Sequence, residues 1–289
     1  MSDRSREVVV TGIGLISPAG DCPERVHGFL AAGGTALAPA VELEERGLPP
    51  LPAAPLREFD ATVYLGKRSL RPLDRTARLA ASAAQRALET SGLDGSDPKR
   101  PAGLVLGTMF GSIETISEFD YRAVSAGAQY AKPMQFANSV INAAAGQTAI
   151  WHRLAGLNAT ISGGAVSGLQ AIGYAADQIR AGRANALLAG GAEELCFPAL
   201  YGFYRQGRFW NGNGTGPCAV PFDRRRNGMA PSEGAALLVL ESRESAEGRG
   251  ARPLAVIRGH GAGFDPSRGA RREGGRAAIA GAIRQALSE

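Results

Sequence analysis

Cysteine and histidine are scarce in this chain of 289 residues, which contains three of each. Cys22, Cys196 and Cys218 are too few and too scattered for a disulfide framework or a CxxC metal site. The histidines stand alone, each without a cysteine or acidic neighbour at the spacing of a metal site or a catalytic triad. We therefore expect no metal site.

Long apolar runs are also missing, and lysine appears only at Lys67, Lys99 and Lys132. No run reaches the roughly 18 residues that a membrane span needs, and the opening MSDRSREVVV has no signal-peptide core. We expect a cytoplasmic chain with no membrane partner. The net charge of +5 comes almost entirely from arginine, without a basic block. This favours an acidic protein partner over nucleic acid, although codon bias toward arginine would explain it equally well.

Aromatic residues are few, at 6%, whereas glycine is abundant, at 39 residues with no fixed period. That balance suits tight turns and close-packed small residues, and it does not fit a fibrous protein. Hydrophobic residues at 44% and charged residues at 20% exclude global disorder. The length allows one large domain or two modest ones.

Apolar strands alternate with amphipathic helices along the chain. Asp74 is a good N-cap and Gly92 a good stop for one helix. Strands are expected at residues 8–10, 104–107, 159–162, 186–189, 235–240 and 254–257, and helices over 74–92, 143–154, 166–181 and near the end of the chain. We expect the Gly190–Gly191 pair to end its strand and residues 31–73 to be a long surface excursion. The alternation predicts an α/β fold with a mostly parallel sheet, covered on both faces.

The sequence Thr11-Gly12-Ile13-Gly14 follows the first strand and invites comparison with a dinucleotide-binding turn. The GxGxxG pattern fails because Ser17 stands at its third glycine, and no acidic residue ends a second strand at the usual distance. We expect no cofactor.

Residues 159–168 (ATISGGAVSG) combine a strand, an elbow of small residues and the start of a helix. We expect one face of that helix to carry Leu169, Ile172, Ala176 and Ile179. A side chain at position 165 would lie at the helix N-terminus, where the macrodipole and free N–H groups stabilise an anion. This geometry lowers the pKa of a cysteine in enzymes that use a thiolate. Here the residue is Ala165, so an ordinary helix start explains the segment equally well.

Seven motifs in order resemble those of the β-ketoacyl-acyl carrier protein synthases, or ketosynthases. They lie at 8–20 (VVVTGIGLISPAG), 106–108 (LGT), 137–146 (ANSVINAAAG), 167–174 (SGLQAIGY), 189–193 (AGGAE), 221–228 (PFDRRRNG) and 232–241 (SEGAALLVLE). The resemblance covers almost the whole chain and implies a thiolase-like αβαβα fold. Residues 1–245 would form its N-terminal half and residues 250–289 the beginning of a truncated C-terminal half.

The chain departs from the family at the catalytic positions. The family's cysteine nucleophile is replaced by Ala165, whose methyl group cannot form an acyl-thioester. The family's two catalytic histidines would lie beyond residue 289, and the His260-Gly-Ala stretch does not match their motifs. Ser162 and Ser167 flank the elbow, but no histidine follows at recognisable spacing to act as a base. We therefore expect no intact catalytic set.

The resemblance also implies an acyl channel and a dimer surface. Channel candidates are Phe110, Met134, Phe136, Phe203 and Met229, with plain core packing as the alternative for the aromatic residues. Dimer-interface candidates are Asn142, Ala159, Thr160, Ile161 and Ser162.

From this resemblance we expect a catalytically inactive, chain-length-factor-like subunit. It would pair with an active ketosynthase as a heterodimer, or with itself, and serve elongation on an acyl carrier protein. Two alternatives stay open: half of a split condensing or acyl-transfer enzyme completed by a second chain, and a non-functional truncated remnant.

Overall fold

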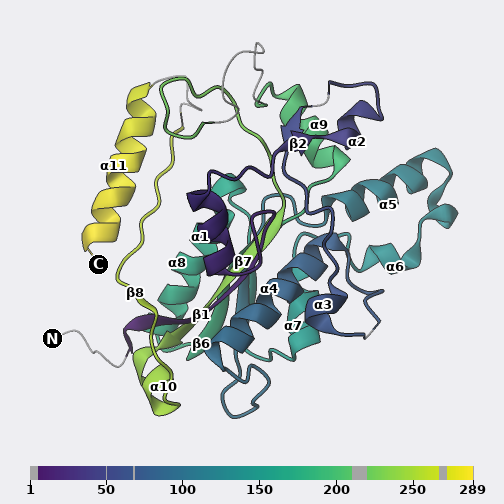
Figure 1. Ribbon diagram of the computed structural model, residues 1–289. Coiled ribbons are helices and arrows are strands. Elements are labelled where there is room, and N and C mark those ends of the chain that lie inside the picture. Colours follow the sequence, from purple (N-terminus) through teal and green to yellow (C-terminus); the bar gives the residue numbers. More distant parts are fainter. Residues whose placement is uncertain (1–5, 50, 68, 210–219, 267–271, 289) are drawn as a thin grey trace.

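The computed structural model describes residues 6–49, 51–67, 69–209, 220–266 and 272–288, and within these a mixed sheet forms the centre of the protein (Figure 1). Its strands lie in the order β5-β4-β6-β7-β1-β8. Their bounds are β1 Val8–Ile16, β4 Gly103–Gly107, β5 Asn158–Ile161, β6 Ala186–Glu193, β7 Gly234–Ser242 and β8 Ala255–Ile257. β8 pairs with β1, so residues of the expected second half extend the same sheet.

The expectation of a mostly parallel sheet is wrong. β4 pairs in parallel with β5 and β6, but β7 runs antiparallel to both β6 and β1, and β8 runs antiparallel to β1. Uniformly apolar strands show that both faces of the sheet are covered, and this holds for either strand direction. Direction depends on the connections, which the apolar pattern does not contain.

Helices cover both faces of the sheet. α4 (Arg75–Ser91) and α7 (Ala143–His152) contribute to the core on one face, and α8 (Ser167–Arg180) to the core on the other. The predicted caps of α4 are confirmed: the Asp74 carboxylate accepts from the Ala77 amide, and Gly92 ends the helix in the left-handed conformation. Of the five layers of a thiolase-like fold, the described residues thus form three, helix, sheet and helix.

Close contact between β1 and α4 explains the glycines of the TGIG motif. A Cβ atom at Gly14 would lie 1.8 Å from the Ala83 carbonyl oxygen, and one at Gly12 would lie 2.5 Å from the Ala87 oxygen. The motif therefore serves to let an alanine-rich helix approach the sheet.

Residues 31–73 are more ordered than a surface excursion. They contain β2 (Ala38–Pro39) paired with β3 (Pro52–Ala53), and the short helices α2 (Val41–Glu44) and α3 (Thr62–Leu65). Leu43, which is fully buried, packs in a small core with Leu200 of α9 (Phe197–Arg205). This core joins segments about 150 residues apart, so the local sequence contains no periodic signal for it.

One expectation near α8 is wrong, and another holds at three of its four residues. Gly190 and Gly191 do not end a strand, because β6 continues through them to Glu193. The core face of α8 includes the expected Ile172, Ala176 and Ile179, together with Ala171 and Ala175. The fourth expected residue, Leu169, is 73% exposed. Leu169, in the first turn of α8, therefore does not belong to the face that packs on the sheet.

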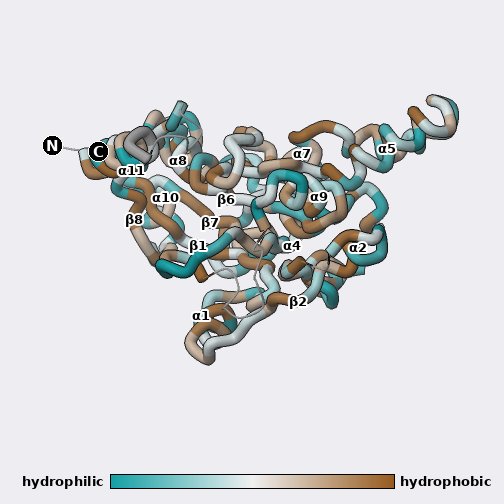
Figure 2. Tube along the Cα trace, turned by 90° about the horizontal axis from the view of Figure 1, so that it is seen from above, coloured by the Kyte–Doolittle hydropathy of each residue, from teal (hydrophilic) through white to brown (hydrophobic). Residues whose placement is uncertain are grey.

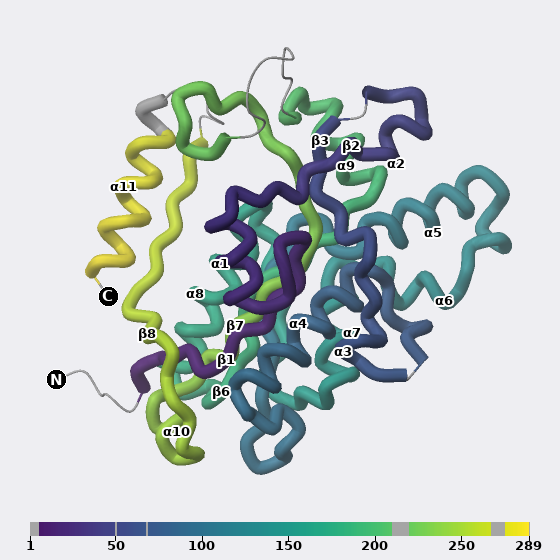
Figure 3. Tube along the Cα trace, viewed as in Figure 1, coloured from purple at the N-terminus to yellow at the C-terminus, as the bar shows by residue number. Residues whose placement is uncertain are grey.

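Two elements lie at opposite sides of this core. α5 (Ile113–Ser125), the short η2 turn (Ala128–Tyr130) and α6 (Pro133–Phe136) project from one side. α11 (Arg272–Ser288) lies on the other, beside the chain that follows β8 (Figures 1 and 3). Seen from above, α5 reaches farthest from the side that holds both termini (Figure 2). No described helix combines the length and apolar character required to cross a membrane.

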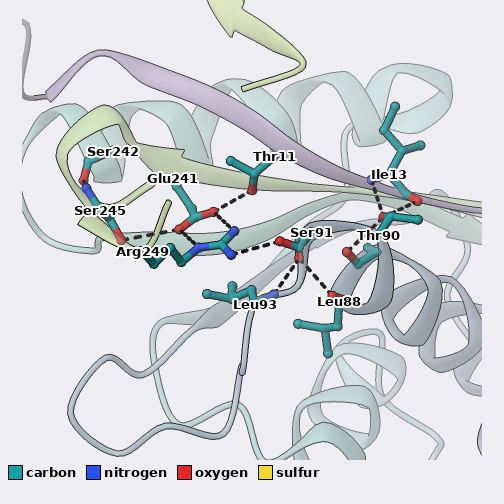
Figure 4. Close-up of polar contacts among 11 residues, drawn as sticks. Thr11, Ile13, Leu88, Thr90, Ser91, Leu93, Glu241, Ser242, Ser245 and Arg249 are labelled. Atoms are coloured by element: carbon teal, nitrogen blue, oxygen red, sulfur yellow. Dashed lines mark hydrogen bonds and ion pairs between the residues drawn. The ribbon is translucent and has the colours of Figure 1, made fainter. Parts of the chain in front are cut away.

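A buried ion pair joins three elements at the end of the sheet away from the elbow (Figure 4). Glu241 of β7 is 0% exposed and is bound by Arg249, which follows α10 (Arg243–Gly248), at 2.6 and 3.0 Å. The same carboxylate accepts from the Thr11 hydroxyl of β1 at 2.5 Å. Arg249 also donates to the Ser91 carbonyl at the end of α4, 2.9 Å away.

Candidate functional site

A cavity of about 450 Å³ lies where β4 and β6 end and α8 begins. Its wall includes Ala165 at the elbow, Thr108 after β4 and Glu193 at the end of β6. Parallel strands present their carboxyl ends at the same edge of a sheet, which is where α/β proteins bind ligands. The position that the sequence singled out therefore opens into a cavity.

The elbow is held close to the sheet by three glycines. Ala165 is exposed in a 3-10 turn (Gly164–Val166) that immediately precedes α8. A Cβ atom at Gly107 would lie 2.4 Å from the Ser167 backbone, and Gly191 lies against Gly168. Larger residues at these places would push the start of α8 away, so the LGT and AGGAE motifs serve to position residue 165.

The two serines near the elbow are engaged in structural hydrogen bonds. The buried Ser167 hydroxyl donates to the Gly164 carbonyl at 2.6 Å and accepts from the Gly163 amide at 2.9 Å. Ser162 Oγ lies 3.5 Å from the Met109 carbonyl oxygen. Neither serine has an imidazole partner among the described contacts, so the arrangement for serine acyl transfer is missing there.

The histidines lie away from the cavity. His152 Nε2 is 2.9 Å from the Ala81 carbonyl oxygen on the α4 side of the sheet, and burial lowers its pKa. His260 lies 3.5 Å from Asp177 of α8. Among the residues that line the cavity in the described structure, none is a histidine, lysine or arginine.

The structure brings together three of the five predicted channel residues. Phe110, Phe203 and Met229 line the cavity with Ala165, and the two phenylalanine rings meet edge to face, 5.7 Å apart. Met134 and Phe136 lie on α6, outside the cavity, and are 68% and 66% exposed. A channel role for all five stays a prediction.

Two glutamates on the cavity wall were not among the predicted site residues. Glu193 accepts from the amides of Met109 and Phe110 at 2.6 and 3.0 Å and from the Thr108 hydroxyl. It thereby fixes the loop that carries Phe110 into the cavity. Burial raises its pKa, and these donors oppose the rise.

Glu194, the next residue, is 2% exposed and accepts from the Glu114 amide at the start of α5, at 2.9 Å. Burial raises the pKa of its carboxyl from the ordinary 4.5 to about 7, and the charges of Asp74 and Glu114 add to the rise. Glu193 ends the AGGAE motif and Glu194 follows it directly, but neither the motif nor the Glu-Glu pair indicates the partners of these residues.

Four of the five predicted dimer-interface residues lie in β5 or directly after it, at one edge of the sheet that the described residues form. β5 contains Ala159, Thr160 and Ile161 and is the outermost strand, bonded to β4 on one side. Asn142 is exposed immediately before α7. The 108–111 loop contacts both Ser162 and Ile141, so the strand edge and the exposed residues Val140 and Ile141 are neighbours.

The remaining candidates for a reactive site are the cysteines and a metal site. Burial raises the pKa of the Cys196 thiol to about 12, which leaves it protonated and poorly nucleophilic. Cys218 lies outside the described residues. No group of three or more histidine, cysteine or acidic side chains in the described ranges is arranged to hold a metal ion. The cavity is therefore mostly apolar, with Glu193 and Glu194 on its wall.

Comparisons with known proteins agree on one family. Residues 5–246 match the family model of the β-ketoacyl synthase N-terminal domain. The chain is 31% identical over 263 residues to 3-oxoacyl-(acyl-carrier-protein) synthase 2 of Coxiella burnetii, covering 90% of this chain and 64% of the relative. It is 34% identical over 271 residues to a putative polyketide β-ketoacyl synthase 1 of Streptomyces halstedii, covering 89% and 63%. The chain thus spans less than two thirds of the length of these relatives.

Solved structures give the same result. The ishigamide ketosynthase/chain length factor is 30% identical, with a TM-score of 0.83 over 98% of this chain and 70% of that chain. A β-ketoacyl synthase from Burkholderia phymatum is 28% identical, with a TM-score of 0.84 over 97% and 70%. The architecture described above is therefore that of a thiolase-like ketosynthase N-terminal domain.

Proposed function

The chain belongs to the β-ketoacyl synthase family, and we propose that it is a subunit that carries no acyl chain itself and pairs with an active ketosynthase. One observation carries the proposal: Ala165 stands at the elbow before α8, at the cavity, where the family's motif has its cysteine nucleophile. A methyl group cannot form the covalent intermediate that condensation requires.

The surroundings of Ala165 support an inactive site. The Ser167 hydroxyl is occupied by two backbone partners, and His152 and His260 both lie away from the cavity. General base catalysis requires an acceptor within hydrogen-bond reach of the nucleophile. The described residues place no such pair at the elbow, so the cavity would hold or shape a chain bound elsewhere.

An active partner would contact the open edge of β5 and the apolar residues beside it. Edge strands present unpaired backbone groups that readily pair with another chain. Val140 and Ile141 are exposed next to this edge, and Met134 and Phe136 are exposed on α6. Large exposed apolar groups of this kind mark association surfaces. The ishigamide relative, described as a ketosynthase/chain length factor, supports such a pairing.

The substrate carrier would be an acyl carrier protein, which the names of the curated relatives contain. Such carriers are acidic, and the net charge of +5 is complementary to them. Phe110, Phe203 and Met229 would limit the shape of the chain that enters the cavity.

A second candidate, one half of a two-chain condensing enzyme, is favoured by the outer face of α8. Leu169 and Val166 are exposed there, beside an apolar groove between α8 and α11 that also includes Ile279. A second chain that covers this groove and supplies histidines would complete a catalytic set.

Co-expression of the tagged chain with candidate active ketosynthases tests the proposal. We expect a stable complex with one of them and weaker recovery with Met134→Asp, because that side chain is exposed on α6. Val63→Asp is the control, since Val63 is equally exposed but lies on α3. Recovery of the chain alone with every partner would contradict pairing and would favour the remnant. An acyl adduct on this chain would favour the two-chain enzyme.

A further inference from the structure

Residues 113–136, from α5 through η2 to α6, form a projection that we call the arm (Figures 1 and 2). The described structure buries none of the residues of α5, η2 or α6. Helices in proteins are stabilised chiefly by packing of an apolar face, so a helix without buried residues depends on its terminal and polar contacts. The way the arm is attached therefore decides how firmly it is held.

Within the arm, Glu118 binds the two limbs together. Its carboxylate accepts from Arg122 at 2.7 Å on α5, from Lys132 at 3.3 Å and from Gln135 at 2.7 Å on the returning limb. The rings of Phe119 and Phe136 lie 6.1 Å apart. These contacts hold the two limbs of the arm together as one unit, and α5 also touches α9 of the body.

At the base, the start of α5 is capped from outside the helix. Ser112 occupies the N-cap position, but its side chain makes no capping bond and its hydroxyl is buried without a partner. The Glu194 carboxylate takes this role by accepting the Glu114 amide at 2.9 Å. An acceptor at a helix N-terminus stabilises the first turn.

The same carboxylate lies in a strongly acidic environment. Arg75 is a cation that acts on Glu114, but it is bound to Glu233 at 2.6 Å. Arg122 and Lys132 are bound to Glu118 within the arm. The acidic and thiol groups are Asp74 of the α4 N-cap, Glu114 and Glu118 of α5, Glu193 of β6, Glu233, Glu42 of α2 and Cys196. One Asp74 carboxylate oxygen is buried with no hydrogen-bond partner. This junction therefore disfavours a further negative charge.

We propose that Glu194 is the anchor of the arm and that its protonation holds the arm against the body. The neutral acid still accepts the Glu114 amide through its carbonyl oxygen, whereas the carboxylate adds a buried charge beside Asp74 and Glu114. Water can solvate that charge only when the arm lifts. Ionisation of Glu194 therefore favours the lifted arm.

The direction and size of the effect follow from proton linkage. The Glu194 pKa is about 7 with the arm in place, against 4.5 for a solvated carboxyl. The attached arm thus binds the proton more tightly, and its attachment weakens as pH rises. If lifting solvates Glu194 fully, the equilibrium constant for lifting rises about tenfold between pH 6 and pH 8.

The consequence of this inference for pairing rests on the proposed function. The arm carries Tyr121, Tyr130, Met134 and Phe136, which are exposed apolar groups that a partner would cover. A partner that recognises the attached arm would bind more weakly as pH rises from 6 to 8. Glu194 is a positioning residue in this account, because it acts on the partner surface through α5.

Hydrogen–deuterium exchange of the chain without a partner tests the inference. After correction for the pH dependence of intrinsic exchange, peptides covering residues 113–120 should lose about tenfold in protection between pH 6 and pH 8. Glu194→Gln, which keeps the acceptor without the titration, should make their protection independent of pH. Glu44→Gln is the control, because Glu44 is exposed on α2, and it should behave as the wild type.

Three outcomes would overturn the inference: protection that does not change with pH in the wild type, the same dependence in Glu194→Gln, or a pH dependence spread equally over α4 and α7. Circular dichroism of Glu194→Gln confirms that the variant is folded. These results are obtained without a partner, so they leave the proposed pairing untouched. Conversely, failure of the chain to pair would leave the behaviour of the arm unchanged.

Discussion

Replacing Arg249 should destabilise the protein far more than replacing any exposed arginine (Figure 4). Arg249→Met removes two bonds to Glu241, at 2.6 and 3.0 Å, and one to the Ser91 carbonyl at 2.9 Å. Glu241 is 0% exposed, so its charge would stay buried with Thr11 and Ser245 as its hydrogen-bond donors. Breaking a buried pair on one side costs about 3–5 kcal/mol of unfolding free energy.

A double replacement separates the loss of the Arg249–Glu241 attraction from the cost of leaving the Glu241 charge buried without Arg249. Arg249→Met combined with Glu241→Met removes both charges and leaves the Thr11 hydroxyl and the Ser91 carbonyl to find other partners. Because an apolar pair of similar volume is often nearly neutral, the double variant should recover at least about 2 kcal/mol relative to Arg249→Met alone.

Equilibrium unfolding in urea, followed by circular dichroism, measures both values. Arg252→Met is the control, since Arg252 is exposed three residues away, and it should stay within about 0.5 kcal/mol of the wild type. The reasoning is refuted if Arg249→Met costs under about 1 kcal/mol, or if the double variant is no more stable than the single one.

Four further predictions concern packing and titration. Glu194→Gln should stabilise the protein at pH 8 and not at pH 4. The pKa of Glu194 is raised from 4.5 to about 7, so the wild type loses about 3 kcal/mol of unfolding free energy as pH rises through that window. Equal urea midpoints of the variant and the wild type at pH 8 would contradict this. Gly14→Ala should abolish cooperative thermal unfolding because its Cβ would lie 1.8 Å from the Ala83 oxygen. Gly28→Ala in α1 (Pro23–Ala31), where nothing lies within 4 Å, should raise stability by about 0.5–1 kcal/mol. Cys196 can be tested alone in a variant that carries Cys22→Ser and Cys218→Ser. Its thiol should not react with a thiol reagent at pH 8 until the protein unfolds, since burial raises its pKa to about 12. Rapid reaction in the native chain would refute the burial of this thiol.

Local signals in the sequence predicted the elements that position the site. Asp74 and Gly92 marked the ends of α4 because caps depend on neighbouring residues. The strand, elbow and helix around Ala165 were evident for the same reason. The family motifs then gave the thiolase-like fold, which strand and helix patterns alone had misread as mostly parallel.

Features that depend on distant contacts were not predicted. α5 was not predicted, and the structure buries none of its residues. The role of Glu194 required the position of the α5 N-terminus, 80 residues earlier in the chain. The alignment of Phe110 with Phe203 across the cavity depends on the loop that Glu193 fixes.

Intact-mass analysis of acyl loading tests the central claim most directly. The chain, co-purified with an active ketosynthase partner, is mixed with an acylated acyl carrier protein, and the mass of each subunit is measured. We predict an acyl adduct on the ketosynthase and none on this chain, since Ala165 has no nucleophilic atom. Ala165→Cys should restore no condensation by itself, because no histidine lines the cavity in the described residues. An acyl adduct on the unmodified chain, or turnover by Ala165→Cys alone, would contradict the account.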